Sequence, residues 1–344
     1  MDASRVDVGG QGSGIRDRVA PKPDPRSLIP DLLRVAVIGV GHLGRHHARI
    51  LSTLDGVALA AVVDKLPDRA AEIAASTGSR SLTDSAALIA SLGGEVDAVT
   101  VAVPTELHRD IAMPFLEQGI SVLVEKPMAR TLAEADEMIA AARKSGATLA
   151  VGHTERYNPA VAAVLPLVTS PRFIEVHRLG VFPERSLDID VVFDLMIHDL
   201  DIIVSMVRSE VTSVEAVGVP VLTPKYDIAN ARLRFASGCI ANVTASRISK
   251  DRVRKIRFFQ PDAYLSIDYA AQEVEGWRLV KREGARPSIE GGPIPVERDE
   301  PLRRELADFA RAVRERGTPV VDGAAGRRAL ELATRIAEKM ESVV

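Results

Sequence analysis

The apolar positions in the first half of the chain alternate between two spacings. Short runs of Val, Ile and Ala are followed by segments whose apolar residues recur at helical spacing. The runs predict buried strands at residues 34–38, 57–63, 79–82, 98–103, 121–124 and 148–151. The segments between them predict helices near residues 68–76, 85–91, 106–118 and 132–145, and a further helix soon after the first strand. Such alternation predicts a parallel sheet with helices on both faces.

The pattern changes after Gly152, where strand-like segments follow one another directly. They predict strands at residues 173–182, 213–222, 229–235, 239–246, 255–260 and 263–269, with a hairpin turn at 236–238. One helix is predicted at 191–207, and two amphipathic helices near 301–316 and 323–341 end the chain. The predicted fold class is therefore α/β, with a doubly wound parallel Rossmann sheet followed by an α+β domain that has a large, mainly antiparallel sheet.

The first 32 residues fit neither pattern, because they are rich in glycine and proline and show no apolar periodicity. We expect residues 1–32 to form a disordered extension. The predicted domains are then residues 33–152, which bind a nucleotide, and residues 153–344, which bind the substrate and form subunit contacts.

Composition narrows the class of protein without naming a function. The 344 residues carry 44 Lys and Arg against 47 Asp and Glu, which argues against general nucleic-acid binding. No apolar run reaches the length of a membrane span, and the start of the chain lacks the apolar core of a secretory signal. The single cysteine, Cys239, excludes an intrachain disulfide and favours a cytoplasmic location. We expect a soluble protein that acts on a small molecule.

The segment after the first strand has the pattern G-x-G-x-x-G. Because it follows a predicted strand and opens a predicted helix, it indicates a dinucleotide site. Gly39 permits a tight turn, Gly41 lets the backbone approach a pyrophosphate, and Gly44 lets helix and strand pack closely. The intervening His42 and Leu43 are assigned to the same cofactor site. The alternative is a glycine turn in an α/β domain that binds no nucleotide.

Asp64 ends the second predicted strand. A carboxylate at this position accepts hydrogen bonds from the adenosine ribose and repels a 2′-phosphate, which favours NAD over NADP. Lys65 and Arg69 could instead hold a 2′-phosphate. His42 and His46 are spaced as a metal pair, but no third ligand is apparent nearby, so we expect structural roles and no metal.

Ligands of open α/β sheets gather at the carboxyl ends of the strands. The residues that we expect at this edge and assign to the cofactor are Val103, Pro104, His108, Glu125 and Lys126. Lys126 is also placed to meet a substrate, and Pro127 after it allows a cis peptide bond. The alternative is a surface Glu–Lys pair before a turn.

Asp194 and His198 lie four residues apart on the helix predicted at 191–207, and Asp201 continues the same stripe. Because the intervening residues are mainly apolar, we expect this polar stripe to be buried. It could be a general base with an orienting carboxylate, a cation site, or a polar cluster that satisfies itself at a domain interface. Six basic residues between 247 and 257 indicate a solvated sheet face, a phosphate site or a subunit interface.

Together, the glycine loop, the segments at 104–108 and 125–127, and the Asp194–His198 pair resemble the Gfo/Idh/MocA family of sugar and polyol dehydrogenases, over residues 33–340. The resemblance implies NAD(P), no catalytic metal, and an open-faced antiparallel sheet that commonly joins homodimers and homotetramers. It also implies a catalytic group of Lys126, Asp194 and His198.

Segments at 151–161, 190–202, 214–249 and 254–269 are similar, more narrowly, to UDP-N-acetylglucosamine 3-dehydrogenases. That similarity implies oxidation of the sugar 3-hydroxyl to a ketone, ahead of the amination that gives the 3-amino sugar of lipid A. His198 would act as general base, Asp194 would orient it, and Lys126 would stabilise the developing alkoxide.

Arginine suits phosphate because its fork donates two parallel hydrogen bonds. The candidates to hold sugar or diphosphate are Arg156 and Asn158, which are preferred, and Arg178, Arg185 and Arg247. Two alternatives stay open: a dehydrogenase of myo-inositol or another polyol, and an NAD-binding regulator without activity.

Overall fold

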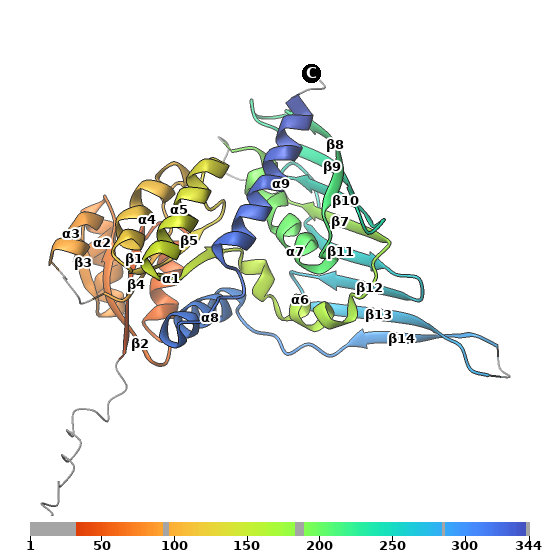
Figure 1. The fold of residues 1–344 in the computed structure, drawn as a ribbon, viewed down its shortest axis with the longest axis horizontal. Coiled ribbons are helices and arrows are strands. Elements are labelled where there is room, and N and C mark those ends of the chain that lie inside the picture. Colours follow the sequence, from red (N-terminus) through yellow and green to blue (C-terminus); the bar gives the residue numbers. More distant parts are fainter. Residues whose placement is uncertain (1–31, 92–95, 183–188, 284–285, 342–344) are drawn as a thin grey trace, which may run out of the picture. The chain divides into compact units, whose positions relative to one another are not determined.

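The computed structural model describes residues 32–91, 96–182, 189–283 and 286–341. Its contacts separate residues 1–32 from a compact unit, Leu33–Val344. The expected disordered extension therefore lies, apart from Leu32, outside the described residues. The compact unit contains two sheets with helices packed on them (Figure 1).

The first sheet of the compact unit has six parallel strands, in the order β3-β2-β1-β4-β5-β6. The strands are β1 (Leu33–Ile38), β2 (Val57–Val63), β3 (Arg80–Leu82), β4 (Ala98–Val101), β5 (Ser121–Glu125) and β6 (Leu149–Gly152). The helices between them are α1 (Gly44–Leu51), α2 (Pro67–Thr77), α3 (Ser85–Ser91), α4 (His108–Glu117) and α5 (Leu132–Ser145), with a short helix η2 (Thr105–Leu107) before α4. This arrangement confirms the predicted Rossmann sheet, and the strand order reverses between β1 and β4, where α/β sheets bind ligands.

The second sheet has eight strands, in the order β14-β13-β12-β11-β7-β10-β9-β8. The strands are β7 (Phe173–Leu179), β8 (Val211–Val219), β9 (Ile228–Phe235), β10 (Ile240–Ser246), β11 (Val253–Phe259), β12 (Ala263–Asp268), β13 (Glu273–Val280) and β14 (Ser288–Ile294). Every neighbouring pair is antiparallel except β7 and β10, which confirms a mainly antiparallel sheet. The sequence pattern did not predict β13 and β14. In β14, the apolar pattern of the sequence is interrupted by Gly291, Gly292 and Pro293. Proline is tolerated there because β14 is an edge strand.

Helices cover one face of the second sheet. They include η3 (Thr154–Tyr157), α6 (Pro159–Val164), η4 (Leu165–Leu167), the π-helical segment η5 (Val192–Met196) and α7 (Ile197–Val207). In the described part of the chain, the other face carries no helix (Figure 1). This open face exposes the apolar side chains of Val217, Phe259, Trp277, Leu279 and Ile289. The expected homodimer or homotetramer contact through it stays a prediction.

The last two helices pack on both sheets. In α8 (Pro301–Glu315), Leu306 and Phe309 share an apolar cluster with Val35 and Val37 of β1. Helix α9 (Gly323–Glu341) contacts α5 on one sheet and α7 and β8 on the other (Figure 1). Between these helices, the carbonyl oxygen of Val321 accepts a 3.1 Å hydrogen bond from the amide of Val151 in β6. The end of the chain therefore contributes to the apolar clusters of both sheets.

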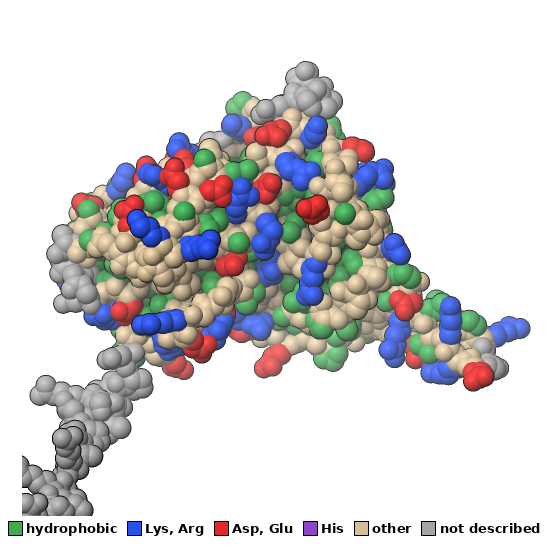
Figure 2. All heavy atoms as spheres, in the orientation of Figure 1, with side chains coloured by type: hydrophobic (Ala, Val, Ile, Leu, Met, Phe, Trp, Pro, Cys, Tyr) green, Lys and Arg blue, Asp and Glu red, His purple; other side chains and the backbone are tan. Residues whose placement is uncertain are grey.

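Basic and acidic side chains are interspersed over the face seen in Figure 2. None of the helices described is long and apolar enough to cross a membrane.

Candidate functional site

Two glycines of the loop after β1 are required by the backbone around them. Gly39 has φ +84°, and a Cβ on it would lie 2.6 Å from the carbonyl oxygen of Ala102. A Cβ on Gly44, the first residue of α1, would lie 1.7 Å from the carbonyl oxygen of Gly39. Both contacts are far closer than van der Waals distance, so any larger residue would displace the loop or the helix.

Gly41 differs from its neighbours, because its own backbone does not require glycine. Among the described residues, a Cβ here would meet only Nη1 of Arg69, at 3.8 Å. The residue lines a cavity of about 340 Å³ together with Gly39, Val103 and Pro104. An open space beside a bare backbone at the start of a helix fits a phosphate of a bound dinucleotide.

Asp64 lies in the same cavity and is largely buried. Its Oδ2 accepts a hydrogen bond from the amide of Val40 at 3.1 Å, and its Oδ1 accepts one from the amide of Leu66 at 3.0 Å. Nη1 of Arg69 lies 3.4 Å from Oδ2. The carboxylate is thus fixed at the end of β2, where a ribose hydroxyl of a dinucleotide can reach it.

His108 shapes this edge of the sheet instead of lining the cavity. Its Nδ1 lies 2.9 Å from the carbonyl oxygen of Pro127, and its Nε2 lies 2.9 Å from that of Val103. Burial lowers the pKa of His108 more than these carbonyls raise it. The ring therefore ties the segment after β4 to the segment after β5.

Lys126 follows β5 and lines a second cavity, of about 760 Å³. The Lys126–Pro127 peptide bond is cis, as the sequence allowed. Nζ of Lys126 donates a 2.6 Å hydrogen bond to the carbonyl oxygen of Asp194 and lies 3.4 Å from its Oδ1. The lysine is only 14% exposed, so its charge is held in place beside one carboxylate.

His198 lines the same cavity from α7. Its Nδ1 is buried and has no hydrogen-bond partner among the described residues, which leaves Nε2 as the nitrogen that faces the cavity. The ring of His153 lies edge-on to it, with 6.2 Å between centroids. Burial and the charges of Lys126 and Arg178 hold the pKa of His198 well below its usual range. The imidazole is therefore neutral at physiological pH and able to accept a proton.

Asp194 makes no hydrogen bond to His198 within the described residues, and its predicted orienting role stays a prediction. Asp194 faces Lys126 instead. Residues 192–196 form a π-helical turn before α7 begins. Because a π-turn is wider than an α-turn, residues four apart no longer stack on one face.

Two buried glutamates lie behind Lys126. Oε1 of Glu125 is 3.0 Å from Nε2 of His47, and Oε2 of Glu305 accepts a 3.1 Å hydrogen bond from the hydroxyl of Thr154. Burial alone would raise the pKa of Glu125, but His47 and Lys126 lower it overall. Burial and the nearby Glu125 carboxylate raise the pKa of Glu305 well above its usual range. The pKa values of the two carboxyl groups are therefore shifted in opposite directions.

Most of the arginines predicted to hold substrate form ion pairs with acidic residues of the protein. Arg156 does not line the cavity, because its guanidinium makes a two-pronged ion pair with Asp201, at 2.9 and 2.7 Å. Arg178 and Arg247 line the cavity but are buried in ion pairs, with Asp199 at 2.6 Å and with Asp227 at 3.4 Å. Arg185 lies outside the described residues.

Asn158 lines the cavity of about 760 Å³, the larger of these two cavities, but its side chain already makes hydrogen bonds within the protein. Its Oδ1 caps α6 by accepting from the amide of Ala160 at 3.0 Å, and its Nδ2 donates to the carbonyl oxygen of Tyr269 at 3.0 Å. Arg252 and Arg254 also line the cavity, although sequence reasoning included them only in the basic run at 247–257, with a phosphate site as one of three alternatives. The alternation of side chains along β11 is the signal that could have separated them from their basic neighbours.

The remaining predicted residues lie around the same loop. Leu43 lines the larger cavity, and the rings of His42 and His46 meet edge to face, 6.0 Å apart. Among the described residues, no group of three or more His, Cys, Asp or Glu is placed to hold a metal ion.

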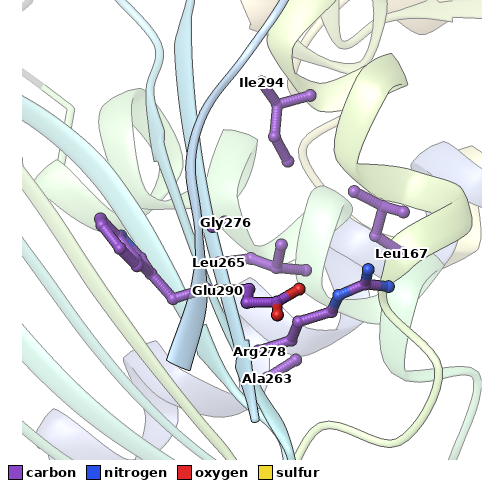
Figure 3. Close-up of a pocket in the computed structure, with 9 residues that line it drawn as sticks. Leu167, Ala263, Leu265, Gly276, Arg278, Glu290 and Ile294 are labelled. Carbon is purple, nitrogen blue, oxygen red and sulfur yellow. The ribbon is translucent and has the colours of Figure 1, made fainter. Parts of the chain in front are cut away.

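A third cavity, of about 470 Å³, lies between Leu167 and strands β12–β14, where Leu265 and Ile294 give it apolar walls (Figure 3). None of the predicted site residues lines it.

Comparison with known proteins supports both halves of the fold. The model of an oxidoreductase family with an NAD-binding Rossmann fold matches residues 33–153, and that of a GFO/IDH/MocA C-terminal domain matches residues 180–261. Over 314 residues, the chain is 37% identical to UDP-N-acetylglucosamine 3-dehydrogenase of Acidithiobacillus ferrooxidans, covering 90% of this chain and 98% of that relative. A solved structure of that enzyme superposes with a TM-score of 0.83 at 36% identity, again covering 90% and 98% of the two chains.

Two further likenesses are more distant. Inositol 2-dehydrogenase of Mycolicibacterium smegmatis is 34% identical over 191 residues, which cover 53% of this chain and 55% of that relative. Levoglucosan dehydrogenase, solved in complex with NADH, shares the fold at 20% identity, with a TM-score of 0.81 over 90% of this chain and 97% of that one. The chain belongs to the Gfo/Idh/MocA family of oxidoreductases.

Proposed function

We propose that the protein oxidises the 3-hydroxyl of UDP-N-acetylglucosamine to a ketone with NAD, the step that precedes 3-amination in the lipid A pathway. The observation that carries the proposal is the larger cavity, where Lys126 and His198 meet several arginines beside the glycine loop. The relative named for this reaction matches the chain over nearly its whole length.

The nicotinamide cofactor, when bound, supplies the acceptor for the hydride that leaves the carbinol carbon. Gly41 and Asp64 would hold its phosphates and its adenosine ribose. The second cavity begins two residues further along the loop, at Leu43, so cofactor and substrate would approach each other there.

His198 removes the hydroxyl proton through Nε2, since its lowered pKa keeps the ring neutral. Lys126 donates a hydrogen bond to the reacting oxygen and stabilises its negative charge as the proton leaves. Asp194 holds the ammonium group of Lys126 in position, at 3.4 Å, and is a positioning residue for the lysine. The cavity is partly closed off from bulk water, which strengthens both interactions.

NAD is preferred to NADP in this proposal. A 2′-phosphate would meet the fixed carboxylate of Asp64, while Nη1 of Arg69 is already 3.4 Å from that carboxylate. Turnover with NAD should therefore exceed turnover with NADP at equal concentrations.

The test is NADH absorbance from purified protein supplied with NAD and either UDP-N-acetylglucosamine or myo-inositol. The inositol arm is included because inositol 2-dehydrogenases match about half of the chain. We expect turnover with the nucleotide sugar, and loss of about 100-fold or more in kcat for His198→Ala with NADH binding retained. Turnover of inositol alone would show that the proposed substrate is wrong. Full activity of His198→Ala would show that His198 is not the general base.

A further inference from the structure

Two arginines of the larger cavity lack an acidic partner. Within the described residues, the side chain of neither Arg252 nor Arg254 makes an ion pair or a hydrogen bond, although both line the cavity and both are exposed. The other cations there are neutralised: Arg178 by Asp199 at 2.6 Å and by Glu155 at 3.2 Å. The cavity therefore contains two uncompensated positive charges.

The register of β11 explains why these arginines differ from their basic neighbours. Ile256 and Phe258 are fully buried on the helix-covered face, and Arg254 lies on that same face, where the cavity opens. Lys255 and Arg257 point to the open face, where they pair with Asp268 at 3.3 Å and Glu175 at 2.6 Å. The strand thus directs one set of cations to the cavity and another to the opposite surface.

Arg254 also lies directly opposite Arg178 in the antiparallel pair of β11 with β7. Like charges directly opposite each other destabilise a sheet. Arg178 is neutralised by its carboxylates, whereas no acidic side chain among the described residues pairs with Arg254. A ligand with two adjacent negative charges would suit Arg252 and Arg254 together, because each guanidinium can donate two hydrogen bonds to phosphate oxygens.

We propose that Arg252 and Arg254 form a subsite for the diphosphate group of a nucleotide-sugar substrate. This inference rests on the proposed function and specifies its substrate class. The pyrophosphate of the cofactor is a different group, because the loop at Gly39 and Gly41 lines the other cavity, which neither arginine reaches. The subsite would hold the diphosphate in the cavity where Lys126 and His198 meet the sugar. A free polyol would leave it unused.

The direct test is calorimetric titration of UDP, and separately of inorganic pyrophosphate, into protein saturated with NADH. NADH occupies the cofactor site, so the added diphosphate reports on the larger cavity. We expect measurable binding of both to wild type, and loss of about 30-fold or more in UDP affinity for the double variant Arg252→Gln/Arg254→Gln. Arg257→Gln, on the same strand but opposite face, is the matched control and should bind UDP as wild type does.

Thermal unfolding with and without NADH would verify that the double variant is folded. Absence of UDP and pyrophosphate binding to wild type, or equal UDP affinity in wild type and double variant, would overturn the subsite. Arginine-dependent UDP binding without turnover of UDP-N-acetylglucosamine would support the subsite and refute the proposed reaction. If the double variant instead oxidises UDP-N-acetylglucosamine with an unchanged KM, the proposed reaction is supported and the subsite is refuted.

Discussion

The two cavities on either side of the glycine loop are built from different parts of the chain. The smaller cavity, proposed above as the cofactor cavity, is shaped by backbone: Gly39 and Gly44 fit only as glycine, and Asp64 accepts backbone amides through both oxygens. The larger cavity, proposed above for the substrate, is lined by charged side chains, most of which form ion pairs with one another. The difference matters because backbone requirements leave a local pattern in the sequence, whereas ion pairs between distant residues leave none.

The largest effect is expected from Gly44→Ala, because the new Cβ would lie 1.7 Å from the carbonyl oxygen of Gly39. Helix α1 would have to move away from β1. We expect the free energy of unfolding to fall by about 3 kcal/mol or more, measured by urea denaturation. Stability equal to wild type would show that the backbone does not dictate this position.

Gly41→Ala is the matched control on the same loop. Because its Cβ would meet no atom closer than 3.8 Å among the described residues, we expect stability like that of wild type. Affinity for NADH should fall about 10-fold, since the methyl group occupies the space that a phosphate needs. Unchanged NADH affinity would place the cofactor phosphates elsewhere.

The cofactor cavity was predictable from sequence because each requirement falls within a few residues of a strand end. The strand predictions around it agree with β1, β2, β4, β5 and β6 to within two residues at each end. In the larger cavity, the presence of Lys126 and His198 was predictable, but the pairing of the side chains around them was not. Arg156 and Asp201 are 45 residues apart, and Thr154 and Glu305 are 151 apart, so only the folded sheets bring them together.

Arg156→Ala tests whether an arginine of the second region is structural. Its partner Asp201 is 2% exposed, so the variant would leave a buried carboxylate without its cation. We expect the free energy of unfolding to fall by about 3 kcal/mol, with KM for the sugar substrate unchanged. Arg327→Ala, which breaks an exposed pair with Asp136, should cost less than about 1 kcal/mol. A raised KM with unaltered stability would instead restore Arg156 as a substrate ligand.

The smallest effect concerns the buried carboxyl of Glu305, where the two regions meet. Its pKa is raised by burial and by Glu125, so between the ordinary pKa and the raised one the folded state keeps a proton that the unfolded state has lost. Stability from this group therefore falls as pH rises above about 4.5. Glu305→Gln removes the ionisation while an amide oxygen can still accept from Thr154. We expect the variant to be about 1 kcal/mol more stable than wild type at pH 8, with the difference shrinking toward pH 4.

Urea unfolding of both proteins at a series of pH values would measure this difference. Glu315→Gln, at the exposed end of the same helix, is the control for replacing a glutamate of α8 outside the buried cluster. A Glu305→Gln difference that is constant between pH 4 and pH 8 would mean that the fold does not raise the pKa of Glu305. Glu125 and Glu305 would then both behave as ordinary carboxylates despite their burial.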